Sequence, residues 1–563
     1  MAQRPVNLTA QQWRDRAIAA KSAGDTAGAE ALFVQGIAAF PKSAPLLNSA
    51  GTFLVGEGRH AEAITRFEAA LVADPRHAEA LCNRAIALSR LGRGMDALAQ
   101  LIAAERNFAQ VPRYWSVRAA TARDLGKLDE AARGYDALLK FEGQHPRGLH
   151  GRARIALERG EADMCARFEQ ALPHNRADAT AFLGYAQALA CSSRLAEARE
   201  LAETLVRQLP TWTDGLTFLA QLRWGAGEAD QFCDHFAQAA KAAPQDPAIA
   251  LAWATALSGT DRHAEAAEVV ARASAALPGN IALALAEAEH AGAAGDLERA
   301  ERIFASLDLQ SPERKLQEAR HRLRQHAPDR ADPLLGEVIA QRPDTISAWA
   351  LRDLAWRMMD DPRAQWLHGQ PGLYAQRSLG LSAAFLADLV ALLRDLHARS
   401  LPPVGQSVRS GSQTWGGLFD RMEPELRTLR VAIEQMLADF RAQLPLADEN
   451  HPLLRHRDRE WFIRGSWSIR MTGGGRHTEH VHPQGILSSA VHLVVPPDAG
   501  VLDAGCLDLG RSPPDLGLDL PPLATITPVA GSAVLFPSTF YHGTQPFGAG
   551  ERMSVAFDVA VAR

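Results

Sequence analysis

Short apolar stretches with helical spacing alternate with glycine and proline along the first half of the chain. In residues 45–75, apolar side chains recur every three or four positions in two successive stretches, as expected of two amphipathic helices. Gly58 lies between the stretches, and the second one stops at Asp74-Pro75. Glycine permits a left-handed turn between helices, and a helix does not continue through proline. The pattern therefore predicts a pair of helices joined by a tight turn.

The same helix pair recurs with a period of 34 residues. The positions that repeat include Gly24, Gly58, Gly92, Gly126 and Gly160, and later Pro210, Pro244 and Pro278. This pattern resembles the tetratricopeptide repeat, and about nine units fit between residues 8 and 307. Arg194 and Asp261 stand where glycine is usual, and the fifth unit closes early at Pro173. We therefore expect a slightly irregular superhelix.

Helix pairs of this kind bury their apolar faces only by stacking, and the stack has a long concave groove. The resemblance implies that this groove binds a peptide, a protein or another subunit. A spacer or a dimerisation surface without a role in substrate binding is the alternative, and the oligomeric state stays open. From 308 to 374 the sequence remains helical but loses the period, which predicts a segment that caps the array and docks it onto the next domain.

Composition restricts the partners and the location that we expect. The chain has 563 residues, a formal net charge of -5 and a pI of about 6.5. This charge favours neither nucleic acid nor an acidic membrane surface as a partner. No apolar stretch approaches the roughly 18–20 residues needed to cross a bilayer, and the polar N-terminal residues do not resemble an export signal. Because the five cysteines also form no CxxC pair, the sequence predicts a cytoplasmic protein with reduced thiols.

The periodicity changes from helical to alternating after residue 460. Before that point we expect helices at 382–399 and 423–443, with a polar loop at 409–415. Beyond it, candidate strands are 463–471, 477–482, 486–495, 501–508, 523–527, 533–536 and 552–561. So many short strands predict a double-stranded β-helix of the jelly-roll or cupin-like kind, with its β core at about 461–563 in a domain covering 375–563. The predicted fold class is multidomain α + β, with an N-terminal α-solenoid and a C-terminal β domain with flanking helices.

Histidines are concentrated in this C-terminal domain. His477, His480 and His482 lie within six residues, and His542 stands alone farther on. Residues i and i+2 of a strand point to the same side, so His480 and His482 are expected to project together. Two imidazoles on one face, joined by a third from a distant strand, form a facial metal site. A cluster of surface histidines beside the glycine-rich turn 473–475 is the alternative at this point.

An arginine and a serine follow the last of these histidines. Arg552 comes ten residues after His542, and Ser554 lies on the same face of the predicted strand. A buried arginine binds a carboxylate through two parallel N–H groups, and a serine hydroxyl can donate another hydrogen bond. A buried arginine without an anion costs several kcal/mol. The pair therefore indicates a site for a dicarboxylic cosubstrate.

These residues occur in the order shown by a known enzyme family. The order His-x-His/Asp, a distal His, and Arg about ten residues later is similar to the prolyl-hydroxylase-like branch of the 2-oxoglutarate oxygenases. The chain also resembles bacterial oxygenases in which tetratricopeptide repeats are fused to such a domain. The shared segments are Gly465–Ser468, the His-x-His-Pro segment His480–Pro483, Ser488–Ala490, Phe-Pro-Ser at 536–538, His-Gly-Thr at 542–544 and Glu-Arg at 551–552.

The resemblance implies that His480 and His542 bind the metal and that Arg552 and Ser554 bind the cosubstrate. Better-known relatives carry aspartate at the position of His482, which we expect to be the third ligand. Three neutral imidazoles leave Fe(II) with its full 2+ charge and let other metals compete.

Two further histidines have open roles. His477 lies on the opposite face from His480 and is expected to be exposed or to support a ligand, although it is the next choice for third ligand. His492 stands where close relatives often show tyrosine. A contact with the cosubstrate and a place in the core are both open for His492.

The activity implied by the resemblance is that of a 2-oxoglutarate-dependent dioxygenase of the hydroxylase type. It would use Fe(II), 2-oxoglutarate and O2, with no catalytic residue beyond the metal centre, and act on a peptide or protein recruited by the repeats. One alternative is a non-catalytic or zinc-bound barrel on a scaffold for protein–protein interaction. The other is a three-histidine iron dioxygenase without 2-oxoglutarate, against which Arg552 and Ser554 argue.

Overall fold

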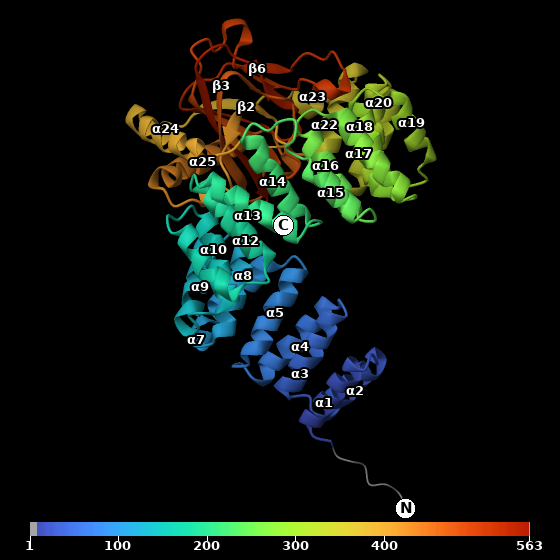
Figure 1. Ribbon diagram of the computed structural model, residues 1–563, viewed down its shortest axis with the longest axis vertical. Helices are drawn as coiled ribbons and strands as arrows, with labels where there is room; N and C mark the ends of the chain where they lie inside the picture. Colours follow the sequence, from blue (N-terminus) through green and yellow to red (C-terminus); the bar gives the residue numbers. More distant parts are fainter. Residues whose placement is uncertain (1–7, 403, 562–563) are drawn as a thin grey trace, which may run out of the picture. The chain divides into compact units, whose positions relative to one another are not determined.

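The computed structural model describes residues 8–402 and 404–561 and divides into two compact units, Met1–Tyr185 and Ala186–Arg563 (Figure 1). Within its described residues the first unit is helical. The second unit contains further helices and all the strands of the described part. The predicted multidomain α + β class is confirmed. The division between the units falls inside helix α12 (Ala179–Cys191), within the stretch predicted as repeats.

The first unit consists of helices that pack in successive pairs, such as α3 with α4 and α8 with α9. Gly58 has a φ of 75° in the turn between α3 and α4. A β-carbon at Gly51 would lie 2.5 Å from the ring of Phe67, so glycine is needed for these two helices to approach closely. The helices are α1 (Ala10–Ser22), α2 (Thr26–Ala39), α3 (Ala44–Gly56), α4 (His60–Ala73), α5 (Ala78–Arg90), α6 (Gly94–Ala103), α7 (Glu105–Phe108), α8 (Pro112–Asp124), α9 (Leu128–Phe141), α10 (Pro146–Glu158), α11 (Met164–Ala171) and the 3-10 turn η1 (Leu172–His174).

Helical pairs continue through the first part of the second unit. Where the usual glycine is missing, the left-handed turn is retained by Ser193 (φ 62°), next to Arg194, and by Asp261 (φ 64°). The helices are α13 (Leu195–Gln208), α14 (Thr213–Gly225), α15 (His235–Ala242), α16 (Pro247–Ser258), α17 (His263–Ala276), α18 (Ile281–Ala293), α19 (Leu297–Ser306), α20 (Pro312–Arg324), α21 (Pro328–Gln341), α22 (Ile346–Met358) and α23 (Arg363–His368).

The last of these helices, α20 to α23, share an apolar cluster with the β domain. Leu516 and Tyr541 are buried in this cluster, and Val481 packs against it. Val481 lies between His480 and His482, and Tyr541 precedes His542. The helices therefore support the back of the chain segments that carry these histidines.

The β domain contains two antiparallel sheets. The larger has the strand order β1-β7-β4-β9-β3-β2, and the smaller has the order β6-β5-β8. The predicted double-stranded β-helix with flanking helices is confirmed. The strands are β1 (Ala375–Ser378), β2 (Val408–Gln413), β3 (Trp461–His477), β4 (Leu487–Val494), β5 (Leu507–Leu509), β6 (Ala524–Ile526), β7 (Ser532–Pro537), β8 (His542–Thr544) and β9 (Glu551–Val561), with 3-10 turns η2 (Leu418–Asp420), η3 (Leu454–His456), η4 (Val501–Asp503) and η5 (Pro514–Leu516).

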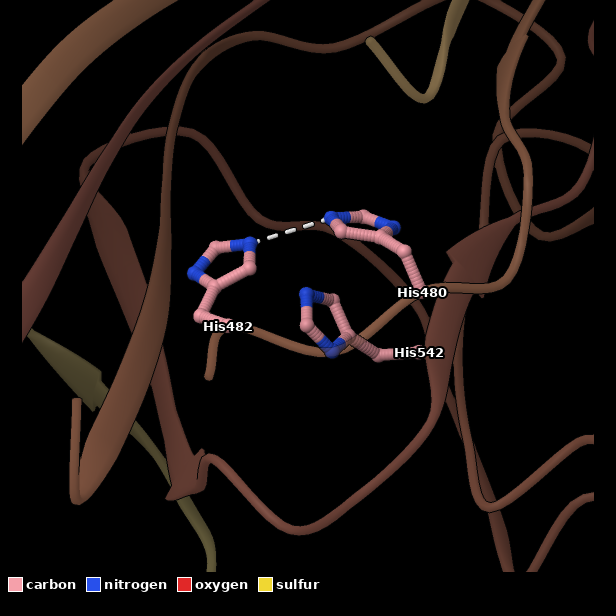
Figure 2. Close-up of side chains that lie close together, drawn as sticks. All are labelled: His480, His482 and His542. Carbon is pink, nitrogen blue, oxygen red and sulfur yellow. Dashed lines mark hydrogen bonds between the residues drawn. The ribbon is translucent and has the colours of Figure 1, made fainter. Parts of the chain in front are cut away.

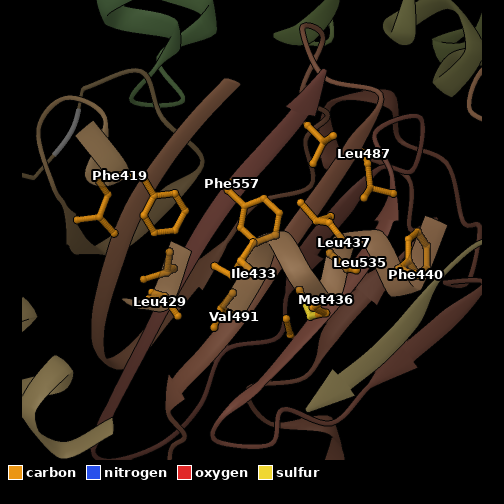
Figure 3. Packing of buried hydrophobic residues seen from close by; sticks show 14 of the residues in the cluster. Phe419, Leu429, Ile433, Met436, Leu437, Phe440, Leu487, Val491, Leu535 and Phe557 are labelled. Atoms are coloured by element: carbon orange, nitrogen blue, oxygen red, sulfur yellow. The ribbon is translucent and has the colours of Figure 1, made fainter. Parts of the chain in front are cut away.

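Two helices, α24 (Ala383–Ala398) and α25 (Pro424–Gln443), cover one face of the larger sheet. Figure 3 shows the contact of α25, where Ile433, Met436 and Phe440 meet side chains from the central strands such as Val491 and Phe557. All five side chains are buried. Because this face is closed by apolar packing, polar chemistry is left to the opposite face of the sheet.

Three of the predicted segments differ from the structure. The expected strand 477–482 is absent: β3 ends at His477, and His480 makes only an isolated bridge to His542. Pro483 has no N–H to donate and restricts the residue before it, so a regular ladder cannot continue there. The expected loop 409–415 overlaps strand β2, which lies at the edge of the larger sheet, where polar residues are tolerated. The expected strand 501–508 is the turn η4 followed by the short strand β5.

The lengths and apolar character of the helices bear on whether any of them could span a membrane. In the described residues, none combines the length and the apolar character needed to cross a bilayer.

Candidate metal centre

Three histidine side chains converge in the β domain (Figure 2). The ring nitrogens that they offer all lie within 4.8 Å of one another. His480 and His482 belong to the segment after β3, and His542 is the first residue of β8. The main chains of His480 and His542 are bonded to each other, each N–H donating to the other carbonyl at 3.0 Å. This bridge brings the distant histidine beside the two that are close in sequence.

Each of the three rings has a hydrogen-bond acceptor at Nδ1. The pairs are His480 with the carbonyl of Thr478 (2.8 Å), His542 with the carbonyl of Phe540 (3.1 Å) and His482 with Oδ1 of Asp558 (2.5 Å). A neutral imidazole that donates from Nδ1 keeps its lone pair on Nε2. Metal-binding histidines are commonly oriented by such bonds from their other nitrogen. The arrangement therefore provides three Nε2 lone pairs for one cation.

The spacing of these nitrogens fits a metal ion. Nε2 of His480 lies 3.0 Å from Nε2 of His482. If both rings hold their proton on Nδ1, two lone pairs face each other at this distance without a bond between them. Two nitrogen ligands that each bind a metal at about 2.1 Å, at right angles, lie about 3.0 Å apart. A divalent cation would satisfy both lone pairs at once.

The electrostatic environment of His480 and His542 favours their neutral form. Burial, together with the neighbouring His482, lowers the pKa of His480 to about 3. Burial and the imidazoles of His480 and His482 hold the pKa of His542 well below its usual value. Neutral imidazole is the form that binds metals. Protons therefore compete weakly with a metal for His480 and His542 near neutral pH.

His477 lies outside the group of three. Its Nδ1 is 3.0 Å from Oγ of Ser407, a hydroxyl that also lies 3.4 Å from Nε2 of His480. The ring centres of His477 and His480 are 5.8 Å apart. The structure thus brings His477 close to the cluster, and the hydroxyl of Ser407 lies between its ring and that of His480.

Arg552 is a buried cation that forms no ion pair with a carboxylate of the described residues. Its exposed fraction is 2 %, and its Nε and Nη1 atoms have no hydrogen-bond partner among the described residues. Burial lowers the pKa of Arg552 to about 10. Leaving a guanidinium unpaired in a protein interior is costly. The site therefore fits an anion that is not supplied by the described part of the chain.

Arg552, Ser554 and the three histidines line one cavity of about 550 Å³. Strand β9 contributes Arg552, Ser554, Ala556 and Asp558 to its wall, since alternate residues of a strand face the same side. The cavity thus combines a metal-binding group with a cationic group.

His492 lies beside this cavity wall on strand β4, in register with Ser554 of β9. Its exposed fraction is 1 %, and neither ring nitrogen has a hydrogen-bond partner among the described residues. Burial and the nearby Arg552 lower its pKa to about 3. A core histidine normally bonds at least one nitrogen. The geometry favours a contact with a ligand over a purely structural place in the core.

Sequence reasoning missed Asp558 and Ser407. The signal for Asp558 was present, because it continues the inward-facing series 552, 554, 556 and 558 of strand β9. No periodic pattern indicates Ser407, which precedes the edge strand β2 and contacts His477 through the fold alone.

Comparison with protein families identifies two regions of the chain. Residues 465–558 match the family described as "Putative 2OG-Fe(II) oxygenase", and residues 54–121 match the family described as "Tetratricopeptide repeat". The chain carries a tetratricopeptide repeat region and a C-terminal domain of this oxygenase family. The oxygenase match includes His480, His482, His542, Arg552 and Ser554. No curated protein matches the chain.

Solved structures resemble parts of the chain at low sequence identity. A tetratricopeptide repeat protein from Parabacteroides merdae is 15% identical and covers 56% of this chain and 98% of its own, with a TM-score of 0.31. A tetratricopeptide repeat protein from Thermus thermophilus is 21% identical and covers 32% of this chain and 99% of its own, with a TM-score of 0.27. A viral collagen prolyl hydroxylase from Paramecium Bursaria Chlorella virus-1, solved as a 2OG complex, is 14% identical and covers 34% and 97%, with a TM-score of 0.23.

Proposed function

We propose that the C-terminal domain is an Fe(II)- and 2-oxoglutarate-dependent dioxygenase that hydroxylates a side chain of a peptide or protein. In this proposal His480, His482 and His542 hold Fe(II), and Arg552 and Ser554 hold 2-oxoglutarate. The oxygenase family supports the reaction class. The residue roles and the substrate class are our inference from the site.

The observation that carries the proposal is the unpaired guanidinium of Arg552 in the cavity of the three histidines. A metal site alone needs no such cation. A dicarboxylate can bind the metal through its keto-acid end and receive two parallel N–H groups from Arg552 at its distal carboxylate. Ser554 and His492 face the same region and can donate further hydrogen bonds to that carboxylate.

The remaining residues define what the protein contributes to the reaction. Bound iron with the keto acid supplies the oxidising chemistry. The bonds that the three imidazoles donate to Thr478, Phe540 and Asp558 fix the orientation of their rings. The cavity volume of about 550 Å³ leaves room for a substrate side chain beside the cosubstrate.

A second cavity supports a peptide or protein substrate. It has a volume of about 400 Å³ and is lined by His263 and His290 of the repeat helices and by Thr478 and Glu479 of the β domain. Thr478 and Glu479 directly precede His480, so this cavity and the metal cluster are separated by one short segment. A chain lying on these helices could place a side chain near the metal, and tetratricopeptide repeats are typical of protein–protein interaction.

The proposed centre is tested by anaerobic titration of the full-length protein with Fe(II) and 2-oxoglutarate. A weak visible charge-transfer band is expected only when both bind the same centre. His542→Ala should abolish the band and iron binding, whereas the matched variant His477→Ala should keep both. A wild-type protein that binds iron without developing the band would favour the zinc-bound scaffold or the three-histidine dioxygenase. Loss of iron binding in His477→Ala alone would move the third ligand to His477.

The substrate class is tested separately. His542→Ala, which should bind the substrate without turning it over, is used to capture partners. The captured proteins are then treated with the iron-loaded wild type and examined by mass spectrometry. A gain of one oxygen atom on a captured protein is the expected result. Oxidation of a small molecule instead, with no modified protein, would contradict the proposed substrate.

A further inference from the structure

The three histidines of the cluster differ in the charge of the group that orients them. His480 and His542 donate from Nδ1 to main-chain carbonyls, which are neutral. His482 donates to the carboxylate of Asp558 at 2.5 Å. Charge-assisted bonds of this kind are shorter and stronger than bonds between neutral groups. His482 is therefore the ligand position that has a negative charge directly behind it.

Asp558 is itself held in place by the two central strands. Oγ of Ser488 on β4 donates to Oδ1 of Asp558 at 3.2 Å, and it lies 2.8 Å from Oγ of Ser538. Both serines are fully buried. In the described part of the chain, Asp558 forms no ion pair with arginine or lysine. Among these residues its carboxylate therefore bonds the ring of His482 and the hydroxyl of Ser488.

We propose that Asp558 is the positioning residue of the metal centre and supplies, from behind His482, the negative charge that a ligand carboxylate would otherwise provide. This inference rests on the proposed function, because it assumes that His482 binds the metal. His482 is the position at which better-known relatives carry aspartate. In this chain the carboxylate of Asp558 stands behind the ring of His482, on the side away from the cluster, instead of binding the metal directly.

Two physical effects follow from this geometry. The bond to Asp558 fixes the proton of His482 on Nδ1, so the lone pair on Nε2 stays directed at the cluster. The negative charge also offsets part of the 2+ charge that three neutral imidazoles leave on the metal. Asparagine at 558 would keep a hydrogen-bond acceptor but remove the charge. Comparing the two residues therefore separates the electrostatic effect from the orientation.

The test is a cycle of four full-length proteins: wild type, Asp558→Asn, His482→Asp, and the double variant. The measured quantity is the affinity for Fe(II), and separately for Co(II), without oxygen and without 2-oxoglutarate. In the wild-type background, Asp558→Asn should weaken metal binding about 10- to 100-fold, the range for loss of a group that orients a ligand. In the His482→Asp background, two carboxylates would stand close together. Removing the charge of Asp558 there should weaken metal binding much less than in the wild-type background, because residue 482 then supplies a carboxylate itself and no imidazole remains for Asp558 to orient.

This difference between the two backgrounds distinguishes a role exerted through His482 from structural damage. A purely structural role would make Asp558→Asn weaken metal binding equally in both backgrounds, which would overturn the proposal. Wild-type affinity in Asp558→Asn would also overturn it. The matched control is Glu551→Gln, which removes a carboxylate from the same strand, where it pairs with Arg394 and Arg470. Its metal affinity should equal that of the wild type.

A failure of this inference can be told from a failure of the proposed function. If Asp558→Asn binds metal normally while His542→Ala does not, the metal centre stands and only the role of Asp558 is wrong. If neither His542→Ala nor His482→Ala changes metal affinity, the metal centre itself is wrong.

Discussion

Arg118 and Arg552 each have an exposed fraction of 2 % or less, and they differ in what surrounds them. Arg118, on helix α8 of the first unit, has no exposed surface and forms ion pairs with Glu105 (2.9 Å) and Glu130 (2.6 Å). It also donates to the hydroxyl of Tyr114 at 2.6 Å. Arg552, on strand β9, is 2 % exposed and has no ion pair among the described residues.

The pKa values of the two groups follow from these surroundings. Burial by itself lowers the pKa of Arg118, but its bonds to Glu105 and Tyr114 outweigh this effect and the pKa is raised. Burial lowers the pKa of Arg552 to about 10 with no carboxylate to oppose it. Removing a buried cation that is paired within its own chain destabilises the fold, because its carboxylate partners are left without it. A buried cation without such partners costs stability and is expected where a ligand supplies the anion.

The largest expected effect comes from removing the unpaired cation. Arg552→Leu should lower the affinity for 2-oxoglutarate at least a hundredfold, since loss of a buried ion pair costs about 3–5 kcal/mol. The same change should leave the free energy of unfolding of the ligand-free protein equal or higher, because a costly buried charge is removed. Calorimetric titration of the iron-loaded protein and thermal unfolding of the metal-free protein measure the two quantities.

The control for this variant is Arg476→Leu, since Arg476 is an exposed arginine on strand β3. It should change neither the affinity nor the stability. A large loss of stability in ligand-free Arg552→Leu would show that Arg552 is structural after all. The contrast with Arg118 would then disappear.

Removing the paired Arg118 should lower stability without changing the affinity for 2-oxoglutarate, the opposite of the result expected for Arg552. Arg118→Leu should destabilise the first unit by about 2–3 kcal/mol, below the cost for a fully buried pair because Glu105 and Glu130 are partly exposed. The affinity for 2-oxoglutarate should not change. Hydrogen exchange of α8 and α9 reports the loss of stability locally. Unchanged exchange in these helices would mean that the ion pairs contribute little to the fold.

Regular elements could be predicted from the sequence because their signals are local. The predicted helix at 382–399 differs from α24 by one residue at each end, and the one at 423–443 differs from α25 by one residue at its start. The edge strands were harder. Strand β2 was predicted as a loop because its residues are polar, and the four-residue β1 was not predicted at all. Their pairing with β3 and β7 depends on partners far away in sequence.

In the candidate site, too, the residues marked by local patterns could be predicted, whereas contacts between distant residues could not. The spacing of His480 and His482 and the alternation of Arg552 and Ser554 are local patterns, so these residues could be proposed before the fold was known. The bond between His482 and Asp558 joins residues 76 positions apart. No local pattern selects Asp558 over other acidic residues as the partner of that ring. Likewise, the sequence does not show whether a carboxylate lies near Arg552, because this depends on the tertiary structure.

A buried base can also remain uncharged, unlike the paired Arg118 and the unpaired Arg552. His451 is an example. This residue follows α25 and has no exposed surface. Its Nε2 donates to the carbonyl of Leu367 at 2.9 Å, and its Nδ1 accepts from the main-chain N–H groups of Leu453 (3.1 Å) and Leu454 (3.2 Å). A proton on Nδ1 would break both accepted bonds. Burial lowers the pKa of His451 to about 4.

The smallest expected effect concerns this neutral histidine and depends on pH. Between pH 6.5 and 4 the unfolded chain binds a proton at His451 that the folded protein does not, so stability falls as the pH falls through this window. From pH 7 to pH 5 the loss due to His451 should be roughly 1–2 kcal/mol. His451→Asn keeps an acceptor near the N–H groups of Leu453 and Leu454 but cannot titrate. Urea unfolding of both metal-free proteins at the two pH values measures the difference, and effects of other histidines cancel in the comparison.

The variant should be less stable than the wild type at pH 7 and should lose less stability at pH 5. An equal loss in both proteins would mean that His451 can be protonated without breaking its bonds, and that this base is accommodated as Arg118 is.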